Sequence, residues 1–343
     1  MTAVKHEGLD LPALQRFLES SGVPVGGELR AELISGGKSN LTYGISDGVS
    51  DWVLRRPPTA GLTPSAHDVA REYRVADALQ NSAVPVARTV ALCEDDAVMG
   101  APFTVVERVD GQVIRSKDDL DALSDAEIES CTDELVRVLV ALHNVDYRAA
   151  GLGEFGRPDG YVTRQVKLWA GQWERVKSRD LPDIDRLHAA LADSIPESPA
   201  PSIVHGDYRI DNTILAGDDV GKVVAVVDWE LATLGDPFTD LALMCVYRNP
   251  ALDLVLGMPA AWTSPRLPST DDLAQKYAVA TGRDIPHWNF YLALANFKLA
   301  VIAQGIDHRW RAGATIGDGF DKAGDSVPAF VAAGLAALKG QTS

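Results

Sequence analysis

The sequence predicts an α+β protein of two lobes, a small lobe built on an antiparallel sheet and a larger lobe that is mostly helical. Residues 30–58 alternate apolar and polar positions between turn signals, as half-buried strands do, and residues 84–111 predict two more strands around the turn EDD. From residue 124 onward, apolar residues recur mainly at helical spacing. The chain has 343 residues, 46% of them hydrophobic, which is enough for two cores. We place the lobes at 1–110 and 111–343.

Composition narrows the class of protein. The 48 acidic and 32 basic residues give a net charge of −16, which argues against nucleic acid and anionic membranes as partners. The acid excess would suit a cationic substrate, but it serves solubility equally well. Three widely spaced cysteines form neither a disulfide framework nor a zinc site. No stretch resembles a signal peptide or a membrane span, so we expect a cytoplasmic protein.

The first lobe begins with Leu11, Leu14 and Leu18 at helical spacing, which predicts an amphipathic helix. Residues 30–58 break at Gly36-Gly37 and at 46–51 and predict three antiparallel strands. In the first break, Ser39 and Asn40 adjoin small residues whose amides could approach nucleotide phosphates. Taken alone, this segment is equally an ordinary hairpin turn.

Two further features of this lobe concern charge. The third strand, DWVLRR, places Arg55 and Arg56 on opposite faces because strand side chains alternate. In the helix predicted over 68–80, Glu72 falls on the same stripe as Val69 and Leu79. An acid on an apolar stripe requires a partner. No basic residue stands at 75 or 76 to provide one within the helix.

The segment 203–240 carries the chemistry. Asp207 follows a short apolar strand, Asn212 stands five positions on, and Asp228 closes a second apolar strand. The turn AGDDVG predicts a hairpin that returns Asp228 beside Asn212. Amide and carboxylate oxygens suit Mg2+, and Asp207 has no Lys or Cys near it in sequence that would keep it from accepting a proton. Together these features indicate phosphoryl transfer. The alternatives are a hydrolase metal site or simple cap and turn residues.

The motifs HGDYRIDN, DWE and GDPFTDLA, in that order, resemble those of the aminoglycoside phosphotransferase-like kinases. The resemblance implies a bilobal protein-kinase-like fold. It implies that Asp207 is the catalytic base and that Asn212 and Asp228 hold Mg2+. It further implies that His205 orients the catalytic loop and that Asp240 ties the loop down.

The same resemblance implies an ATP site in the first lobe. Arg55 stands where typical kinases have the Lys that grips the phosphates, and Glu72 would pair with it. The planar guanidinium group of Arg is not geometrically equivalent to the ammonium group of Lys. Arg55 is therefore a departure from the family pattern. The backbone from Glu107 to Val109 would meet the adenine edge.

The second lobe contains a helical insertion at about 151–201. Trp169 and Trp173 share a helix face there, and we expect at least one of them to pack in the core. The resemblance makes Arg164 and Trp169 candidates for contact with the phosphate acceptor. The last long helix, over 287–313, is predicted to form core. Lys298 is expected near one of the solvent-exposed edges of this helix and without a chemical role.

The stretches GGKSNLTY, VLRRPP, SAHDVAREYRV and FYLALANFKLAVIAQGI resemble the phosphotransferase domain that is fused to some acyl-CoA dehydrogenases. This implies an ATP-dependent kinase acting on a small-molecule hydroxyl, a hydroxyacyl-CoA or related hydroxy acid, with a functional link to an acyl-CoA dehydrogenase. Two alternatives stay open, and the oligomeric state is not predicted. One is an aminoglycoside phosphotransferase. The other is a nucleotide-binding regulatory pseudokinase, suggested by Arg55 and the reduced glycine loop.

Overall fold

The structure is a computed structural model that describes residues 7–36, 40–58, 68–314 and 319–341. The chain divides into two compact units, Met1–Asp110 with Val224–Ala232, and Gly111–Val223 with Thr233–Ser343. The sequence-based division leaves 224–232 in the second lobe, whereas the contacts of this segment group it with the first. Ser39, a predicted nucleotide-binding residue, lies outside the described residues.

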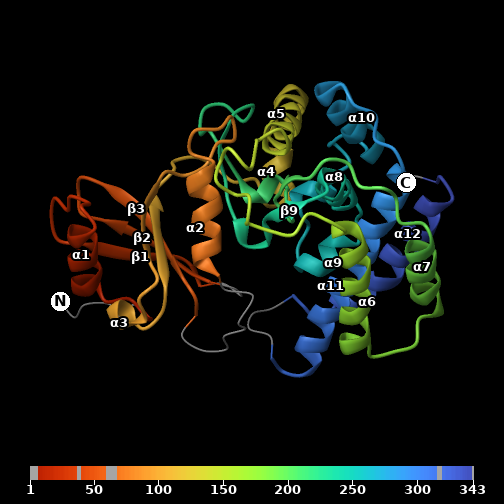
Figure 1. Cartoon of the computed structure of the whole chain (residues 1–343), viewed down its shortest axis with the longest axis horizontal. Helices are drawn as coiled ribbons and strands as arrows, with labels where there is room; N and C mark the ends of the chain where they lie inside the picture. Colours follow the sequence, from red (N-terminus) through yellow and green to blue (C-terminus); the bar gives the residue numbers. More distant parts are fainter. Residues whose placement is uncertain (1–6, 37–39, 59–67, 315–318, 342–343) are drawn as a thin grey trace. The chain divides into compact units, whose positions relative to one another are not determined.

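The first unit is built on one five-stranded antiparallel sheet with the strand order β1-β2-β3-β5-β4 (Figure 1). The three strands predicted within 30–58 are present, and the two predicted within 84–111 follow them. The strands are β1 (Arg30–Gly36), β2 (Leu41–Ser46), β3 (Asp51–Arg56), β4 (Thr89–Cys93) and β5 (Phe103–Glu107). The connection between β4 and β5 also holds a short helix, α3 (Asp96–Met99).

Two helices cover the sheet of this unit on opposite faces. The predicted amphipathic helix is α1 (Leu11–Ser20), and its Leu14 and Leu18 pack into the core with Leu54 of β3. The other face is covered by α2 (Val69–Ala78), which contacts β4 and β5 (Figure 1). Since β3 alternates, Arg56 lies on the α1 side, where it donates to the Met99 carbonyl at 3.0 Å. Arg55 therefore lies on the α2 side.

A separate segment completes the first unit. The strand β8 (Val223–Val226) leads into it, and the Val226 N–H donates to the Pro85 carbonyl at 2.8 Å. A 3-10 turn, η2 (Trp229–Leu231), follows and contacts α2. The DWE motif thus belongs to the same unit as Arg55 and Glu72.

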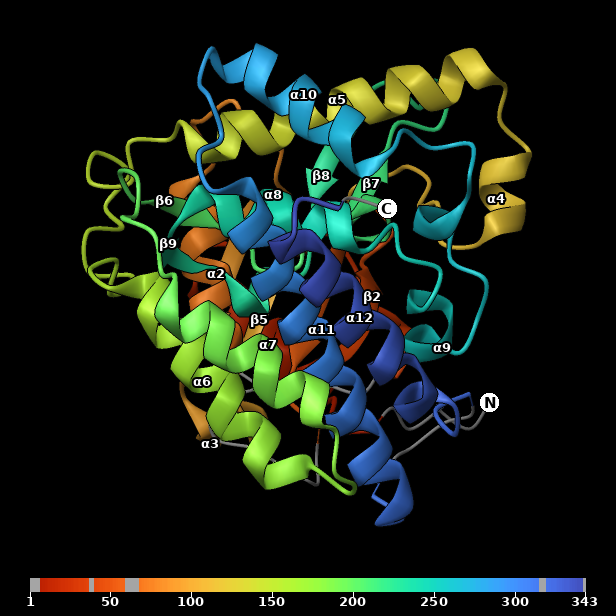
Figure 2. The ribbon, with the colours of Figure 1, turned by 90° about the vertical axis from the view of Figure 1, so that its right-hand side faces the viewer.

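The second unit is mostly helical, and its central element is the long helix α11 (Trp288–Arg311). Figure 2 shows α11 flanked by α6 (Tyr161–Val176), α7 (Pro182–Asp193) and α12 (Val327–Leu338). The stripe predicted on α11, comprising Phe290, Leu294, Phe297 and Val301, is buried. α12 is not among the predicted elements, because its Val, Ala, Gly and Leu residues give no polar face to mark a helical period.

The other elements of this unit surround the catalytic segment. The capping box predicted at Ser124 and Glu127 is present at the start of α5. The helices are α4 (Lys117–Asp121), α5 (Asp125–His143), α8 (Pro237–Val246), α9 (Leu252–Leu256) and α10 (Thr270–Thr281), and the short strands are β6 (Ser202–Val204), β7 (Thr213–Leu215) and β9 (Thr233–Gly235). In the described ranges, no helix combines the length and the apolar character needed to cross a bilayer.

Candidate active site

The loop that carries Asp207 begins where β6 ends. β6 pairs with β9, so the loop leaves a fixed edge. The next two residues turn the chain, and Gly206 adopts a left-handed φ of 83° that glycine takes without strain. The N–H groups of His205 and Gly206 donate to the two carboxylate oxygens of Asp240, at 2.5 and 2.8 Å. The predicted tie between Asp240 and the catalytic loop is therefore present in the structure.

Asp240 is buried in the first turn of α8, and His143 contacts it in addition to the two backbone N–H groups. The Nε2 atom of His143 lies 3.5 Å from its Oδ2 atom. Burial acts to raise the pKa of Asp240, but His143, His205 and the Gly206 N–H outweigh it, so the pKa lies below its usual value. His143 ends α5 as expected, yet its ring also supports the loop, a role the sequence did not predict.

The Asp207 side chain is held by several donors from the same unit. Asn212 Nδ2 donates to its Oδ2 atom at 2.9 Å and to its main-chain carbonyl at 2.8 Å. The Asp207 N–H donates to His205 Nδ1 at 3.2 Å, which agrees with an orienting role for that ring. About a fifth of the side chain (22%) remains exposed, so an incoming hydroxyl has access to it.

Two further residues touch the Asp207 carboxylate and were not predicted. The Tyr247 hydroxyl donates to Oδ1, and Arg209 Nε lies 3.4 Å from the same atom. Burial raises the pKa of Tyr247 well above its usual value, so this hydroxyl keeps its proton. The prediction considered Lys and Cys alone, and the charged neighbour of Asp207 is an arginine. Arg209 stands two residues away within the motif, whereas Tyr247 is distant in sequence and gave no signal.

The residues predicted to hold metal have suitable oxygen atoms. Because Asn212 Nδ2 is committed to Asp207, its Oδ1 is left to face a ligand, and no described residue donates to it. Asp228, in the first unit, adopts a left-handed φ of 65°, which Asp tolerates better than most residues. Mg2+ takes one or two protein oxygens of this kind and completes its shell with phosphate and water. The chemistry of both residues therefore fits Mg2+.

A cluster of charges surrounds Arg55 in the first unit. Its guanidinium lies 3.2 Å from Glu72, 2.8 Å from Asp228 and 3.7 Å from Glu230. Burial acts to lower the pKa of Arg55, but the three carboxylates outweigh it and raise the pKa. Burial raises the pKa of Glu72 to about 8, against the opposing charge of Arg55. The predicted pairing of Arg55 with Glu72 is present as a contact of 3.2 Å, and the two acids of the DWE motif lie beside the same guanidinium.

The remaining predicted nucleotide contacts lie in the first unit. Asn40 is buried, and its Nδ2 donates to Glu72 at 3.3 Å. The N–H of Glu107 donates to the Arg88 carbonyl at 2.8 Å, and its side chain is exposed. No described group accepts from the Val109 N–H, which leaves it available to a nucleobase. Of the predicted connector, Val109 rather than Glu107 offers a free donor.

The two acceptor candidates differ in their surroundings. Arg164 is exposed, and its guanidinium donates to the carbonyls of Arg157 and Asp159, so it closes the loop before α6. Trp169 is half-buried, and its Nε1 donates to Gln165 at 3.1 Å. Trp173 is buried, which confirms that one of the two tryptophans packs in the core.

A small cavity adjoins the catalytic loop. Its lining includes Tyr161, Gln165, Trp169, Gly206, Leu243 and Lys298. Lys298 Nζ donates to the Gly206 carbonyl at 2.9 Å and lies 5.7 Å from the centre of the Trp169 ring. Lys298, expected near a solvent-exposed edge and without a chemical role, is half-buried and lines this cavity. A charged residue between Phe297 and Leu299 within a buried apolar run was the signal that could have pointed to it.

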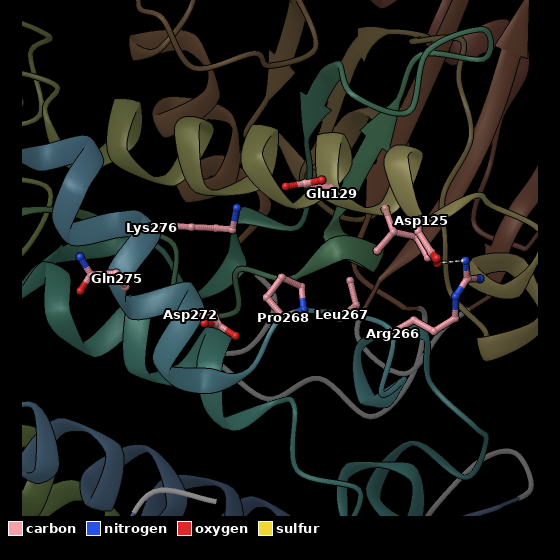
Figure 3. A pocket seen from close by; sticks show the side chains of 9 residues that line it. Asp125, Glu129, Arg266, Leu267, Pro268, Asp272, Gln275 and Lys276 are labelled. Atoms are coloured by element: carbon pink, nitrogen blue, oxygen red, sulfur yellow. Dashed lines mark hydrogen bonds and ion pairs between the residues drawn. The ribbon is translucent and has the colours of Figure 1, made fainter.

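A second hollow of about 410 Å³ lies elsewhere on this unit (Figure 3). Residues from α5, α10 and the loop before α10 line it. Both of its cations are already paired, with Arg266 2.6 Å from Asp125 and Lys276 2.5 Å from Asp133. None of its lining residues belongs to the motifs, so we do not assign it to the reaction.

Together, the small antiparallel sheet, the helical second unit and the anchored Asp207 loop define a kinase-like phosphotransferase. The model of the phosphotransferase enzyme family matches residues 30–273, and the chain belongs to that family. A crystal structure from Ralstonia eutropha JMP134, of a protein assigned to the aminoglycoside phosphotransferases, is 35% identical with a TM-score of 0.84. The match covers 97% of this chain and 99% of that one. Enzymes of this family use ATP to transfer phosphate to hydroxyl groups.

More distant structures share the fold. A thermostable mutant of aminoglycoside phosphotransferase APH(4)-Ia, in complex with ADP and hygromycin B, is 17% identical with a TM-score of 0.60. The match covers 93% of this chain and 97% of that one. At this identity the likeness shows the protein-kinase-like fold alone.

Two curated relatives belong to longer proteins. Acyl-CoA dehydrogenase family member 10 of Mus musculus is 34% identical over 87% of this chain and 28% of the relative. Acyl-CoA dehydrogenase family member 11 of Homo sapiens is 33% identical over 89% of this chain and 40% of the relative. The chain therefore spans well under half the length of these relatives.

Proposed function

We propose that the protein is an ATP- and Mg2+-dependent kinase that phosphorylates the hydroxyl of a hydroxyacyl-CoA or a related hydroxy acid. The observation that carries the kinase chemistry is the Asp207 loop, fixed by Asp240 and oriented by Asn212. The acceptor class is supported by the identity to two proteins named as acyl-CoA dehydrogenase family members. A functional link to an acyl-CoA dehydrogenase is part of the same proposal.

In this reaction Asp207 orients the acceptor hydroxyl and takes its proton as the oxygen attacks the γ-phosphorus. The new bond joins that oxygen to phosphorus, the bond to the β–γ bridging oxygen breaks, and ADP leaves. Asn212 and Asp228 would hold Mg2+, which when bound neutralises charge on the phosphates. His205 and Asp240 keep the loop in the shape that presents Asp207.

The first unit would bind the nucleotide. Arg55, kept charged by its neighbouring acids, is the cation available to the phosphates, and Glu72 fixes its position. The Val109 N–H is the donor for the nucleobase edge. Asn40 would have to exchange its contact with Glu72 for one with phosphate. Ser39 is proposed as a further phosphate donor.

The test is ADP release from Mg-ATP with a panel of hydroxyacyl-CoAs, free hydroxy acids and aminoglycosides, using Asp207→Asn as the blank. We expect turnover on the acyl acceptors alone. Turnover on aminoglycosides alone would replace the proposed acceptor class with the antibiotic class. Binding of ATP without any need for Mg2+, with no turnover on the panel, would favour a regulatory pseudokinase.

A further inference from the structure

The cavity beside the catalytic loop contains a half-buried cation that the phosphoryl-transfer chemistry does not use. Lys298 projects from α11, and its single hydrogen bond to a described residue goes to the Gly206 carbonyl at 2.9 Å. An ammonium group carries three N–H donors, so two are left for a ligand. Gly206 immediately precedes Asp207, which brings this cation to the reacting end of the loop.

The electrostatics of the cavity favour an oxygen ligand on this cation. Burial lowers the pKa of Lys298, while the charges of Asp207 and Asp240 oppose that effect. Both carboxylates already accept hydrogen bonds, Asp240 from two backbone N–H groups and Asp207 from Asn212. A buried ammonium with spare donors is stabilised by an oxygen that accepts them.

The other cavity groups point to the same ligand chemistry. Gln165 accepts from Trp169 Nε1 through its Oε1 atom, which leaves its NH₂ group as a donor. Tyr161, Leu243 and Leu294 supply aromatic and aliphatic surface. The cavity thus offers N–H donors from Lys298 and Gln165 beside this surface, and Thr239 and Asp240 complete its polar side. The free space of about 30 Å³ admits one oxygen-sized group. A carbonyl or carboxylate oxygen can accept from these donors, whereas a protonated amine would place a second positive charge beside Lys298.

We propose that Lys298 binds the carbonyl or carboxylate oxygen of the phosphate acceptor, and so positions the acceptor hydroxyl and selects acyl compounds over amines. This inference rests on the proposed function and deepens it. Lys298 acts as a positioning and specificity residue, while Asp207 carries the proton transfer. The hydrogen bond from Lys298 to the Gly206 carbonyl has a separate effect. Through it, a ligand bound to Lys298 would also help to hold the catalytic loop in position.

The experiment compares three acceptors of equal chain length: a hydroxyacyl thioester, the corresponding diol and the corresponding amino alcohol. Steady-state ADP release is measured for the wild-type chain and for Lys298→Met and Lys298→Gln. The Gln variant keeps an N–H donor for the Gly206 carbonyl but removes the positive charge. Arg309→Met, at an exposed position on the same helix, is the matched control.

We expect the wild type to prefer the thioester over the diol, and the diol over the amino alcohol. Both Lys298 variants should lower kcat/KM for the thioester by about 10- to 100-fold, mainly through KM, while the diol changes far less. Arg309→Met should keep the wild-type order. Circular dichroism and the affinity for Mg-ATP establish that the variants are folded.

Three results would overturn the inference. If Lys298→Gln keeps the thioester preference, the lysine serves only to hold the loop. If both variants lose activity equally on all three acceptors, the role is general rather than selective. In these two cases the proposed function stands, because the wild type still phosphorylates the thioester. If the wild type phosphorylates only the amino alcohol, or none of the three acceptors, both the proposed acyl acceptor and this inference are refuted.

Discussion

Replacing Asp240 with Asn should destabilise the second unit measurably. The carboxylate accepts the His205 and Gly206 N–H groups through separate oxygens and is buried. Asn keeps one acceptor and turns an NH₂ group toward the other N–H, so one buried donor loses its partner. That loss costs about 1–3 kcal/mol, and losing the negative charge beside His143 adds to it. We expect a total of about 2–4 kcal/mol at pH 7.

The pH dependence of the unfolding free energy provides a second test of this prediction. The pKa of Asp240 is lower in the folded chain than in the unfolded chain, so its contribution to stability is present above the unfolded value. That contribution is lost as the pH falls through the folded value. The difference in unfolding free energy between wild type and Asp240→Asn should therefore stay constant from about pH 8 to 5 and narrow below about pH 4.

Urea unfolding followed by circular dichroism at several pH values provides the measurement. Asp183→Asn is a suitable control, because Asp183 is exposed and makes only an i,i+3 pair with Arg186. It should change stability by less than about 0.5 kcal/mol. A cost below about 1 kcal/mol for Asp240→Asn, or a difference that widens in acid, would refute the role given to this carboxylate.

Three other substitutions test separate parts of the site. Since the pKa of Glu72 is raised on folding, its contribution to stability is lost as the pH rises toward 8. Glu72→Gln should therefore gain about 1 kcal/mol or more relative to wild type between pH 5 and 9, and a relative loss in urea unfolding would contradict this. Tyr247→Phe removes the hydroxyl donated to Asp207 and should lower kcat about 3- to 30-fold with little change in ATP affinity. An unchanged kcat would show that this contact is incidental. Arg164→Ala should leave the acceptor KM within about twofold, because its guanidinium is committed to backbone carbonyls. A rise of an order of magnitude would return Arg164 to the acceptor site.

The local parts of the fold and site could be predicted from the sequence. Strand alternation placed Arg55 and Arg56 on opposite faces of β3, and the apolar stripe of α2 marked Glu72 as an acid in need of a partner. The motif around Asp207 accounts for the contacts made within the loop, including the hydrogen bond from Asn212. Such features follow from the geometry of one strand, helix or loop.

The contacts that escaped prediction join distant parts of the chain. His143 and Tyr247 reach the catalytic loop from the end of α5 and the end of α8, and a single sequence does not record that proximity. The sequence places Lys298 at a solvent-exposed edge of α11, because charged residues are usually exposed. Its burial depends on how α11 packs beside α6 and the loop. Tertiary packing, rather than local pattern, decided each of these positions.

The most direct measurement is single-turnover phosphorylation of a hydroxyacyl-CoA by the purified chain with Mg-ATP, with phosphate transfer followed by mass spectrometry. The wild type should form the phosphorylated acyl product. Asp207→Asn should bind Mg-ATP with similar affinity and lose about 100-fold or more in rate. Equal rates for the two proteins would remove Asp207 from the mechanism. Absence of product from the wild type, with ATP still bound, would contradict the proposed acceptor.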